Sequence, residues 1–381
     1  MTRIALVPLS YDAKKYEAFN ITTFLLAKEL KSLGNEVYII TRRNPGQKKE
    51  ETVDGVRVFR PVYSPRFSNI FDFLLFPVTQ LFVQAYAVYK ANKKYNLKLE
   101  VVNSISSAPI VALRSFIVKR LIKNIKTVHT LKGISMLPFG SMKYSRFLNF
   151  SDKVVVQTEF LKKKVIENGC RKEKVKVIDT LIDLSKFKPA KKDFRKKYGF
   201  GKEKIVMYYG HLKPIKGVDY LIRASQFFGK NVKFVIVWSG AGDFQYHMNL
   251  INVLGVSEKF KIIPSQPVEN LVELISCADV LVFPYSSVKS TEMPPSSVLE
   301  SLACRKPVVT SDFPELKVVF TDKKDVLYSK PRDAKDLSEK INLVLSDKKQ
   351  AEKLMKNSVS KAKQFDAKQV AKKYSELYKY L

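Results

Sequence analysis

The sequence predicts an α/β protein built from two doubly wound domains, each a mainly parallel sheet covered by helices. Three observations support this fold class. The 381 residues are many for one core and typical of two domains. Residues 4–41 show a strand, a loop, a helix and a second strand, which is the order that opens a doubly wound sheet. The same order begins again at Ile205.

In the first half of the chain, short apolar runs alternate with helical segments. A loop over residues 8–20 follows the first strand, and a helix then runs to Leu33 and ends at Gly34. We expect two helices in the aromatic segment Phe67–Tyr95, with most of its rings in the core, and another helix ending at Gly169. The expected strands are Ile4–Val7, Val37–Thr41, Lys126–Thr130, Asp152–Gln157 and Val175–Ile178, and Val53–Pro61 is expected to be a short strand or a hairpin.

The second half repeats this alternation after a charged, loop-like run, residues 188–204, which we take as the domain boundary. We therefore expect a domain over residues 1–188, another over 201–365, and a final helical segment over 366–381. The expected strands are Ile205–Tyr209, Lys233–Trp238, Lys261–Pro264, Asp279–Pro284 and Pro307–Thr310. The expected helices include one starting near Val218, then Val268–Cys277, Asp336–Ser346, Ala351–Phe365 and Ala367–Leu381.

The chain is strongly basic, with 68 Lys and Arg against 36 Asp and Glu and a net charge of +32. Such an excess predicts an anionic partner, namely nucleic acid, an acidic membrane surface or phosphorylated substrates. The alternative is a lysine-rich surface that reflects the composition of the host. The excess is uneven, because Tyr63–Phe150 holds 13 Lys and Arg against only Asp72 and Glu100.

Two segments of this basic region favour peripheral contact with an anionic membrane. The aromatic segment ends in a basic tail, and Ala112–Lys126 is a basic amphipathic stretch. The longest apolar run, Ile70–Tyr89, is interrupted by polar residues and a proline, which argues against a spanning helix. Three scattered cysteines predict neither a disulfide framework nor a zinc site and fit a reducing cytosol, and the N-terminus lacks a signal-peptide pattern. We expect a cytoplasmic protein, associated with the membrane on its cytoplasmic face.

The stretch Ser290–Asp312 carries the strongest candidate site. A loop with two prolines and two serines leads onto a helix, whose N-terminus has unpaired amides and a partial positive charge suited to phosphate. Ser296 or Ser297 is the expected N-cap. Glu300 lies in the first turn and Glu292 in the preceding loop, so both carboxylates can face one ligand. The alternative is that Glu300 only complements the helix dipole and that the spacing is chance.

A second candidate site is the run GHLKPIKG between an expected strand and an expected helix. Gly210 and Gly217 bracket a loop that carries His211, Lys213 and Lys216. Backbone amides and cations at a strand-to-helix turn suit a diphosphate. The spacing is not that of a Walker loop.

In the first half, His129 ends an expected strand, and side chains at the carboxyl ends of such strands face the binding crevice. The alternative is a structural histidine. The loop over residues 8–20 also follows a strand, but it has no glycine-rich phosphate fingerprint, which argues against a classical dinucleotide site.

These motifs resemble those of the large retaining glycosyltransferase family four. GHLKPIKG is followed by ADVLVFPYSS, by Glu292 and Glu300 with seven residues between them, and by LESLACRKPVV, in the order of the family's C-terminal domain. In the first half, TVHT, SDKVVVQTEFLKKKV and KVIDTLIDLSKFKP are similar to the family's segments. The resemblance implies the GT-B fold, in which two Rossmann-like domains face across a cleft and the last helix returns to the first domain.

The resemblance also implies a reaction and roles for five residues. The reaction is transfer of a sugar from a nucleotide diphosphate sugar to an acceptor with retained anomeric configuration. Glu300 is expected to hold the ribose hydroxyls, and Glu292 to contact the donor sugar. Lys216 is expected to bind the diphosphate, assisted by His211, where the family usually has arginine. His129 is expected to lie near the reacting sugar.

Further residues complete the expected site. Because Pro294 and Pro295 have no N–H, the amides of Ser297 and Val298 are expected to contact the phosphates. Ile263 is assigned to donor binding, and Ser10 and Tyr11 of the first loop to acceptor binding. No Asp-x-Asp sequence occurs, so no metal or other cofactor is expected.

The sequence therefore predicts a retaining glycosyltransferase that uses a nucleotide sugar and acts on a lipid-linked acceptor or a membrane-surface glycan. One alternative is another GT-B enzyme, either a nucleotide-sugar epimerase or a soluble glucan or sucrose-type synthase. The other is a basic nucleic-acid-binding protein, but the chain shows no aromatic RNA-binding signature, zinc finger or clear helix-turn-helix, so we expect no nucleic acid as partner.

Overall fold

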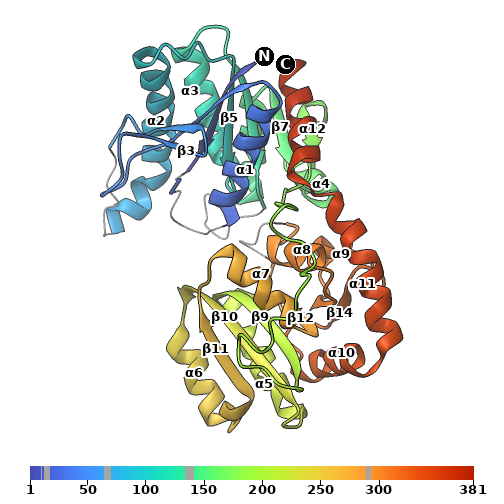
Figure 1. The fold of residues 1–381 in the computed structure, drawn as a ribbon. Helices are drawn as coiled ribbons and strands as arrows, with labels where there is room; N and C mark the ends of the chain where they lie inside the picture. The colour runs from blue at the N-terminus through green and yellow to red at the C-terminus, as the bar shows by residue number, and fades with distance from the viewer. Residues whose placement is uncertain (10, 13–17, 64–69, 134–140, 289–292) are drawn as a thin grey trace. The chain divides into compact units, whose positions relative to one another are not determined.

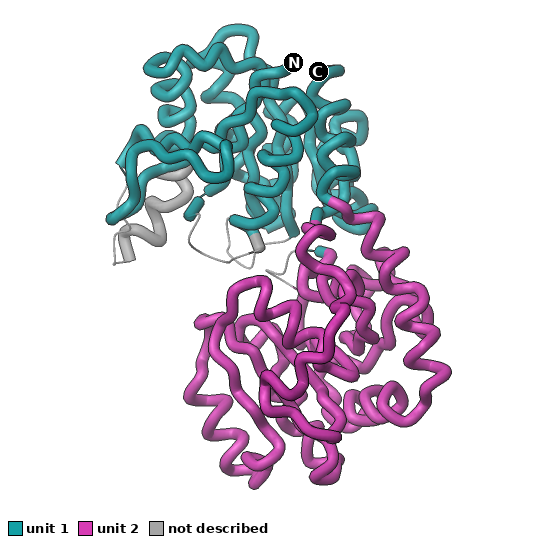
Figure 2. Tube along the Cα trace, in the orientation of Figure 1, with its two compact units in different colours: residues 1–181, 290–293, 367–381 teal, residues 182–289, 294–366 magenta. Residues whose placement is uncertain are grey.

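The computed structural model describes residues 1–9, 11–12, 18–63, 70–133, 141–288 and 293–381, with the backbone alone at residues 18 and 70–80. Two compact units share these residues (Figure 2). Unit 1 contains residues 1–181 and 367–381, and unit 2 contains residues 182–289 and 294–366. The division falls at Leu181, several residues before the boundary expected at residue 188.

Unit 1 is built on an eight-stranded sheet with the order β3-β4-β2-β1-β5-β6-β7-β8. All neighbouring strands are parallel except the hairpin of β3 and β4. The strands are β1 (Arg3–Pro8), β2 (Glu36–Ile40), β3 (Glu50–Val53), β4 (Val56–Phe59), β5 (Val101–Ser106), β6 (Lys126–Leu131), β7 (Lys153–Val156) and β8 (Val175–Val177).

Helices cover both faces of this sheet, as alternation along β1 requires (Figure 1). Ile4 and Leu6 pack with α1 (Ala18–Ser32) and α12 (Ala367–Lys379). Ala5 and Val7 pack with α2 (Ile70–Lys94) and α3 (Leu113–Leu121) on the other face. The remaining elements are η1 (Pro109–Ala112), η3 (Met142–Phe150), α4 (Glu159–Glu167) and η4 (Lys172–Lys174).

Helix α12 completes the core of unit 1 although it follows unit 2 in the chain. Its buried side chains Val370, Tyr374 and Tyr378 belong to the same core cluster as Ile4 and Leu6. The Asn103 side-chain amide donates to the Tyr378 hydroxyl oxygen over 2.7 Å.

Unit 2 is built on a six-stranded parallel sheet with the order β11-β10-β9-β12-β13-β14. Its strands are β9 (Lys204–Leu212), β10 (Val232–Gly242), β11 (Phe260–Pro264), β12 (Val280–Phe283), β13 (Val308–Ser311) and β14 (Leu327–Ser329). Counted from β9, the order is 3-2-1-4-5-6, which is the Rossmann order. The predicted fold class, α/β with two doubly wound sheets, is therefore confirmed.

The helices of unit 2 follow the strands in alternation, as the sequence predicts. They are η5 (Pro214–Lys216), α5 (Val218–Ala224), η6 (Ser225–Phe227), α6 (Phe244–Val253), η7 (Ser257–Lys259), α7 (Val268–Cys277), α8 (Ser296–Ala303), α9 (Pro314–Lys317), α10 (Ala334–Ser346) and α11 (Lys348–Lys363). Asp333 and Asp347 cap α10 and α11, since each carboxylate accepts a bond from a first-turn amide.

Several elements differ from the sequence predictions; helix α6, for example, was not expected. The aromatic segment forms one helix, α2, where two were expected. Strand β5 was missed, although its six residues are all buried. The described residues also contain the short strand β14, which was not expected. No helix among the described residues is long and apolar enough to span a bilayer.

Candidate functional site

The site in unit 2 lies where the chain leaves β9 and β12, the two neighbouring strands at which the sheet order reverses. In doubly wound sheets, ligands bind beyond the carboxyl ends of the strands at this point. His211 lies near the end of β9, and the chain then runs through η5 to Gly217; after β12 it runs through Pro284 and Tyr285. Four of the residues that the sequence assigned to the donor thus lie at the end of β9, after it, or in α8, namely His211, Lys216, Ser297 and Glu300.

The loop after β9 is fixed against the loop after β12. Gly217 has a φ of 67°, in the left-handed region that favours glycine. A Cβ atom at this position would lie 1.9 Å from the Pro284 carbonyl oxygen. The Ser286 amide donates to the Ile215 carbonyl oxygen over 3.1 Å, and its hydroxyl donates to the Pro214 carbonyl oxygen over 2.7 Å. These contacts set the position of Lys216, which ends η5.

Tyr285 connects Lys216 with the N-terminus of α8. The Lys216 Nζ atom lies 5.0 Å from the centroid of the Tyr285 ring, within reach of a cation–π interaction. The Tyr285 hydroxyl lies 3.3 Å from the Ser297 Oγ atom. Tyr285 is almost fully buried, and this burial raises its pKa. The tyrosine therefore orients a cation and a helix N-terminus toward the same region.

Helix α8 begins with an N-terminus that has no side-chain cap, because its N-cap residue is Pro295 and neither serine serves as the expected cap. The Val298 amide donates to the Pro295 carbonyl oxygen over 3.1 Å. The sequence assigned the amides of Ser297 and Val298 to the phosphates. The Val298 amide is bonded within the helix, so the Ser297 amide is the remaining candidate of the two.

Glu300 of α8 is buried, with 8% of its surface exposed, and its carboxylate contacts the Tyr209 hydroxyl of β9. The Tyr209 hydroxyl lies 3.1 Å from Glu300 Oε2 and 2.7 Å from the Ser297 carbonyl oxygen, to which it donates. Burial, and next the negative charge of Glu300, raise the pKa of Tyr209 well above its usual value. Tyr209 therefore stays a protonated donor that fixes the carboxylate and the first turn of α8 together.

The other donor-site candidates lie at the same edge of the sheet. The carbonyl oxygen of half-buried His211 accepts a bond from the Tyr208 hydroxyl over 2.6 Å. Ile263 of β11 is half-buried and pairs in register with Val237 of β10. Beyond Val237, the Oγ atom of Ser239 is buried and has no hydrogen-bond partner among the described residues, a feature that the sequence analysis missed.

In unit 1, His129 is fully buried on β6. Its Nε2 atom lies 3.0 Å from the Ser106 Oγ atom, and its Nδ1 atom has no partner in the described part of the chain. Burial, and next the positive charge of Arg114, lower the pKa of His129 to about 3, so the imidazole is neutral near pH 7. Arg114 is itself fully buried and donates to the Val7 carbonyl oxygen over 3.0 Å.

Of the two acceptor candidates, only Tyr11 can be placed. It is buried beside the ion pair of Arg60 and Glu51, whose atoms are 2.6 Å apart. Burial, and next the charge of Glu51, raise the pKa of Tyr11 to about 12. The other acceptor candidate, Ser10, and the catalytic candidate Glu292 lie outside the described residues.

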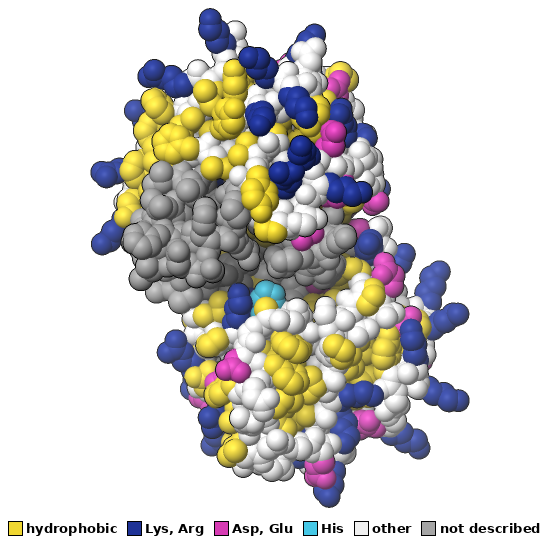
Figure 3. Space-filling model, turned by 90° about the vertical axis from the view of Figure 1, so that its left-hand side faces the viewer, with side chains coloured by type: hydrophobic (Ala, Val, Ile, Leu, Met, Phe, Trp, Pro, Cys, Tyr) yellow, Lys and Arg dark blue, Asp and Glu magenta, His cyan; other side chains and the backbone are white. Residues whose placement is uncertain are grey.

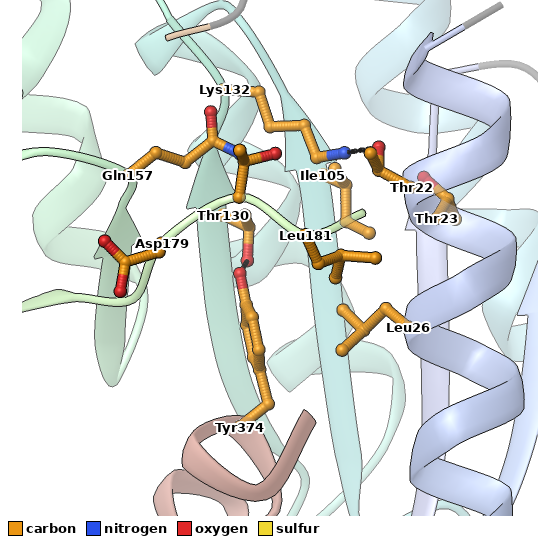
Figure 4. Close-up of a pocket in the computed structure, with 11 residues that line it drawn as sticks. Thr22, Thr23, Leu26, Ile105, Thr130, Lys132, Gln157, Asp179, Leu181 and Tyr374 are labelled. Carbon is orange, nitrogen blue, oxygen red and sulfur yellow. Dashed lines mark hydrogen bonds between the residues drawn. The ribbon is translucent and has the colours of Figure 1, made fainter. Parts of the chain in front are cut away.

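Unit 1 also contains a small cavity of about 10 Å³ beyond the end of β6 (Figure 4). Lys132 reaches across it toward α1 and donates to the Thr22 hydroxyl. The Thr130 and Tyr374 hydroxyls, 3.4 Å apart, lie at another wall. The volume suits about one water molecule, so this cavity is a structural feature and not a substrate pocket. The described residues contain no group of three or more His, Cys, Asp or Glu side chains arranged to hold a metal ion.

Two family models match the chain. Glycosyltransferase Family 4 matches residues 20–186, and Glycosyl transferases group 1 matches residues 190–361. The N,N'-diacetylbacillosaminyl-diphospho-undecaprenol alpha-1,3-N-acetylgalactosaminyltransferase of Campylobacter jejuni is 30% identical over 223 residues, which cover 55% of each chain. The matches span about half the length of the curated relatives that head the comparison.

Solved structures match the whole chain. Sucrose-phosphate synthase from Thermosynechococcus elongatus has a TM-score of 0.80 at 19% identity and covers 100% of this chain and 99% of its own. Anabaena HepE in complex with UDP and glucose has a TM-score of 0.77 at 16% identity, with 100% of both chains covered. At these identities the likeness shows the fold, which is GT-B.

Proposed function

Because glycosyltransferase family models match residues 20–186 and 190–361 and the chain has the GT-B fold, we propose that it transfers a sugar from a nucleotide diphosphate sugar to an acceptor. One observation carries this proposal. Lys216, the N-terminus of α8 and Glu300 are joined through Tyr285 and Tyr209 at the point where the sheet order of unit 2 reverses. A cation, backbone amides and a carboxylate held together in this way are suited to a nucleoside diphosphate.

Within this proposal, different residues of unit 2 bind different parts of the donor molecule. Glu300 accepts hydrogen bonds from the ribose hydroxyls, since Tyr209 fixes its carboxylate. Lys216 and the Ser297 amide bind the diphosphate, with His211 beside them and no metal ion required. Ile263 contributes to the wall of the donor site, and Glu292 contacts the donor sugar.

The chemistry requires stabilisation of a leaving group that gains negative charge. As the bond from the sugar to the nucleoside diphosphate breaks, the charge on the phosphate oxygens grows, and preorganised donors lower the barrier. Hydrogen bonds to charged groups contribute about 1.5–3 kcal/mol each. We propose that a hexose is transferred with retention of its anomeric configuration and that His129 acts near the reacting sugar in its neutral form.

For the acceptor, we propose a lipid-linked or membrane-surface glycan, bound by the loop that contains Ser10 and Tyr11. Two findings support a lipid-linked molecule. The Campylobacter relative is named for a diphospho-undecaprenol acceptor. In addition, the charge excess per residue is higher between Tyr63 and Phe150 of unit 1 than in the rest of the chain. The enzyme would then act in the cytoplasm, at the membrane surface.

Donor binding can be tested by thermal-shift measurements with UDP, GDP, ADP and their common sugar conjugates. A ligand that binds only the folded chain raises its melting temperature. We expect one nucleotide series to stabilise the wild type but neither Glu300→Ala nor Lys216→Ala. Glu258→Ala and Lys230→Ala are the controls, since both are exposed residues of unit 2 that precede β11 and β10, at the ends of the strands opposite the site.

A transfer assay with labelled donor then tests the reaction. We expect Glu300→Ala and Lys216→Ala to abolish transfer while both variants remain folded, which a cooperative melting transition would show. Full activity in both variants would refute the donor site. Product analysis distinguishes transfer to a glycan or lipid from epimerisation of the donor and from synthesis of a soluble glucan or a sucrose-type product.

A further inference from the structure

One face of unit 1 combines exposed rings with exposed cations on three neighbouring elements, α2, α3 and η3. On α2, Phe82 and Tyr86 are 58% and 49% exposed, and Lys90 follows at the same four-residue spacing. This spacing places the three side chains on one side of the helix. The Lys90 Nζ atom lies 6.0 Å from the centroid of the Tyr86 ring.

The same pairing of ring and cation occurs on α3 and η3. Phe116 of α3 is 44% exposed, and the Arg120 guanidinium lies 5.0 Å from its centroid. Phe150 of η3 is 38% exposed, and its ring lies 5.5 Å from that of Phe116. Phe150 also stacks with Phe147, over which the Arg146 guanidinium lies at 5.4 Å.

These elements form a continuous surface, because α2 packs against α3 and α3 packs against η3. Figure 3 shows hydrophobic side chains gathered on the upper unit, with basic side chains around them. Residues 81–126 and 141–150 contain many Lys and Arg but a single acidic residue, Glu100. Glu100 is engaged with Arg3, whose Nε atom lies 3.2 Å from its carboxylate.

We propose that this face, defined by Phe82, Tyr86, Lys90, Phe116, Arg120, Arg146 and Phe150, binds the surface of an anionic lipid bilayer. The proposal deepens the lipid-linked acceptor suggested above by naming the surface that brings the enzyme to its substrate. Aromatic rings enter the boundary between headgroups and acyl chains, and basic side chains pair with anionic headgroups.

The arrangement of the rings favours a bilayer over nucleic acid. Single-stranded nucleic acid binds by stacking its bases on open aromatic faces. Here Arg120 lies over the Phe116 ring, and Phe150 meets that ring edge-on at an interplanar angle of 62°. The Phe116 ring is thus covered on one face and met at an angle by a second ring, which makes it a poor platform for a base, whereas insertion into a headgroup layer requires only an apolar edge.

The proposal can be tested by co-sedimentation of the full chain with vesicles, either of phosphatidylcholine alone or of an equal mixture of phosphatidylcholine and phosphatidylglycerol. We expect the wild type to sediment with the mixed vesicles at low salt, to be released at high salt, and to remain in solution with phosphatidylcholine alone. Failure to sediment with the mixed vesicles at low salt would overturn the proposal.

Two variants separate the contributions of charge and apolar insertion. Lys90→Glu combined with Arg120→Glu and Arg146→Glu should weaken binding to the mixed vesicles by at least about a hundredfold, since each basic residue near an acidic bilayer contributes roughly a fivefold factor. Phe82→Ser combined with Phe116→Ser should also weaken binding, while the release by salt persists. All five side chains are exposed, so we expect both variants to fold.

The controls lie in unit 2. Lys335→Glu combined with Lys349→Glu and Lys353→Glu reverses three exposed charges of unit 2, and Phe227→Ser combined with Tyr246→Ser removes two of its exposed rings. If the unit 2 charge variant loses as much binding as the unit 1 charge variant, net charge alone explains it and the proposal fails. Binding to single-stranded RNA that is tighter than binding to the mixed vesicles, and lost in the unit 1 variants, would also overturn it.

A further measurement separates this proposal from the proposed reaction. Stabilisation by the nucleotide donor, measured without vesicles, should be the same in the unit 1 surface variants and the wild type. If nucleotides fail to bind while the vesicle results hold, the reaction is wrong and the docking surface stands. If nucleotides bind while the vesicle results fail, the docking surface is wrong.

Discussion

Tyr209 is the residue on which the geometry of the donor site depends most directly. Its hydroxyl contacts a backbone carbonyl of α8 and the carboxylate of Glu300. A glutamate in the first turns of a helix has rotamer freedom that a ligand would have to remove on binding. The tyrosine removes this freedom in advance, so the carboxylate is preorganised for hydroxyl groups.

Replacing Tyr209 by Phe tests this role. We expect Tyr209→Phe to lower the free energy of unfolding by about 1–3 kcal/mol, since buried acceptors lose their donor. It should also weaken donor binding, seen as a higher KM with a smaller change in kcat. Tyr328→Phe is the matched control, because that buried hydroxyl donates to the Phe320 carbonyl oxygen over 3.0 Å. The control should lose stability and keep the wild-type KM, and equal effects on KM in both variants would contradict the role.

A second prediction at the scale of a residue concerns His129 and the pH dependence of the free energy of unfolding. The pKa of His129 is lowered to about 3 in the fold, first by burial and then by Arg114. Because the pKa of His129 in the folded chain lies below its unfolded value, burial of the neutral imidazole favours folding fully only above about pH 6.5. This contribution to the free energy of unfolding is lost as the pH falls toward 3. Between about pH 6.5 and pH 5 this loss amounts to roughly 2 kcal/mol.

Urea unfolding of the wild type and of His129→Gln, at matched pH values near 7, 6 and 5, measures this contribution. We expect the free energy of unfolding to fall more steeply with decreasing pH in the wild type than in the variant. The comparison uses the slope, so a constant loss of stability in the variant does not affect it. Parallel slopes would show that His129 does not titrate in this way.

At the scale of elements, the join between η5 and the end of β12 sets the position of Lys216. Gly217 makes this join possible, because its φ of 67° and the close Pro284 carbonyl leave no space for a side chain. Gly255 offers a matched comparison, with a φ of 64° and no atom within 4 Å of an added Cβ.

We therefore expect the same substitution to lower the free energy of unfolding by different amounts at these two glycines. Gly255→Ala should lower the free energy of unfolding by about 1–2 kcal/mol through its backbone conformation alone. Gly217→Ala should lose a further ~1–3 kcal/mol by steric overlap and should also lose stabilisation by the nucleotide. Urea unfolding and thermal shifts with the nucleotide measure both effects, and equal costs would show that the loop moves away freely.

The elements also show how much of the fold could be predicted from the sequence. Most strands and helices of unit 2 were predicted, because their apolar runs are short and regularly separated by turn residues. Strand β5 was missed because three of its six residues, Asn103, Ser104 and Ser106, are polar. Their burial is made possible by distant partners, such as Tyr378 for Asn103 and His129 for Ser106, which local periodicity does not show.

The candidate site also contains some residues that the sequence predicts and others that it does not. Lys216 and Gly217 could be predicted because a strand-to-helix turn with glycines and cations is a local pattern. Tyr209 and Tyr285 could not, because each stands in or beside an apolar run that predicts a core residue. The ring of Tyr209 is indeed in the core, but its hydroxyl serves residues about 90 positions away, as the separations to Ser297 and Glu300 show.

At the scale of the whole molecule, unit 1 is discontinuous in sequence. Helix α12 packs on α1 and supplies buried Tyr374 and Tyr378 to the core. Tyr380, which directly follows this helix, is 78% exposed. The stability of unit 1 thus depends on residues that follow all of unit 2.

A pair of substitutions at the end of α12 tests this dependence. Tyr378→Ala should lower the free energy of unfolding of unit 1 by about 3–5 kcal/mol, because a fully buried ring and the bond from Asn103 are lost. Tyr380→Ala should change it by less than about 0.5 kcal/mol. Hydrogen exchange of the β1 and β5 amides reports on unit 1 specifically, and unchanged protection in Tyr378→Ala would refute the dependence.

The late position of α12 has a consequence during synthesis on the ribosome. Domains generally fold as units in the order in which they are made. Here the segment that is made first can cover this face of its sheet only in part, with α1, until α12 has emerged, whereas unit 2 is complete before that helix is translated. A nascent chain that stops within unit 2 would therefore expose the part of this core that α12 covers to chaperones and proteases. The core of unit 1 is therefore complete only after the whole of unit 2 has been translated.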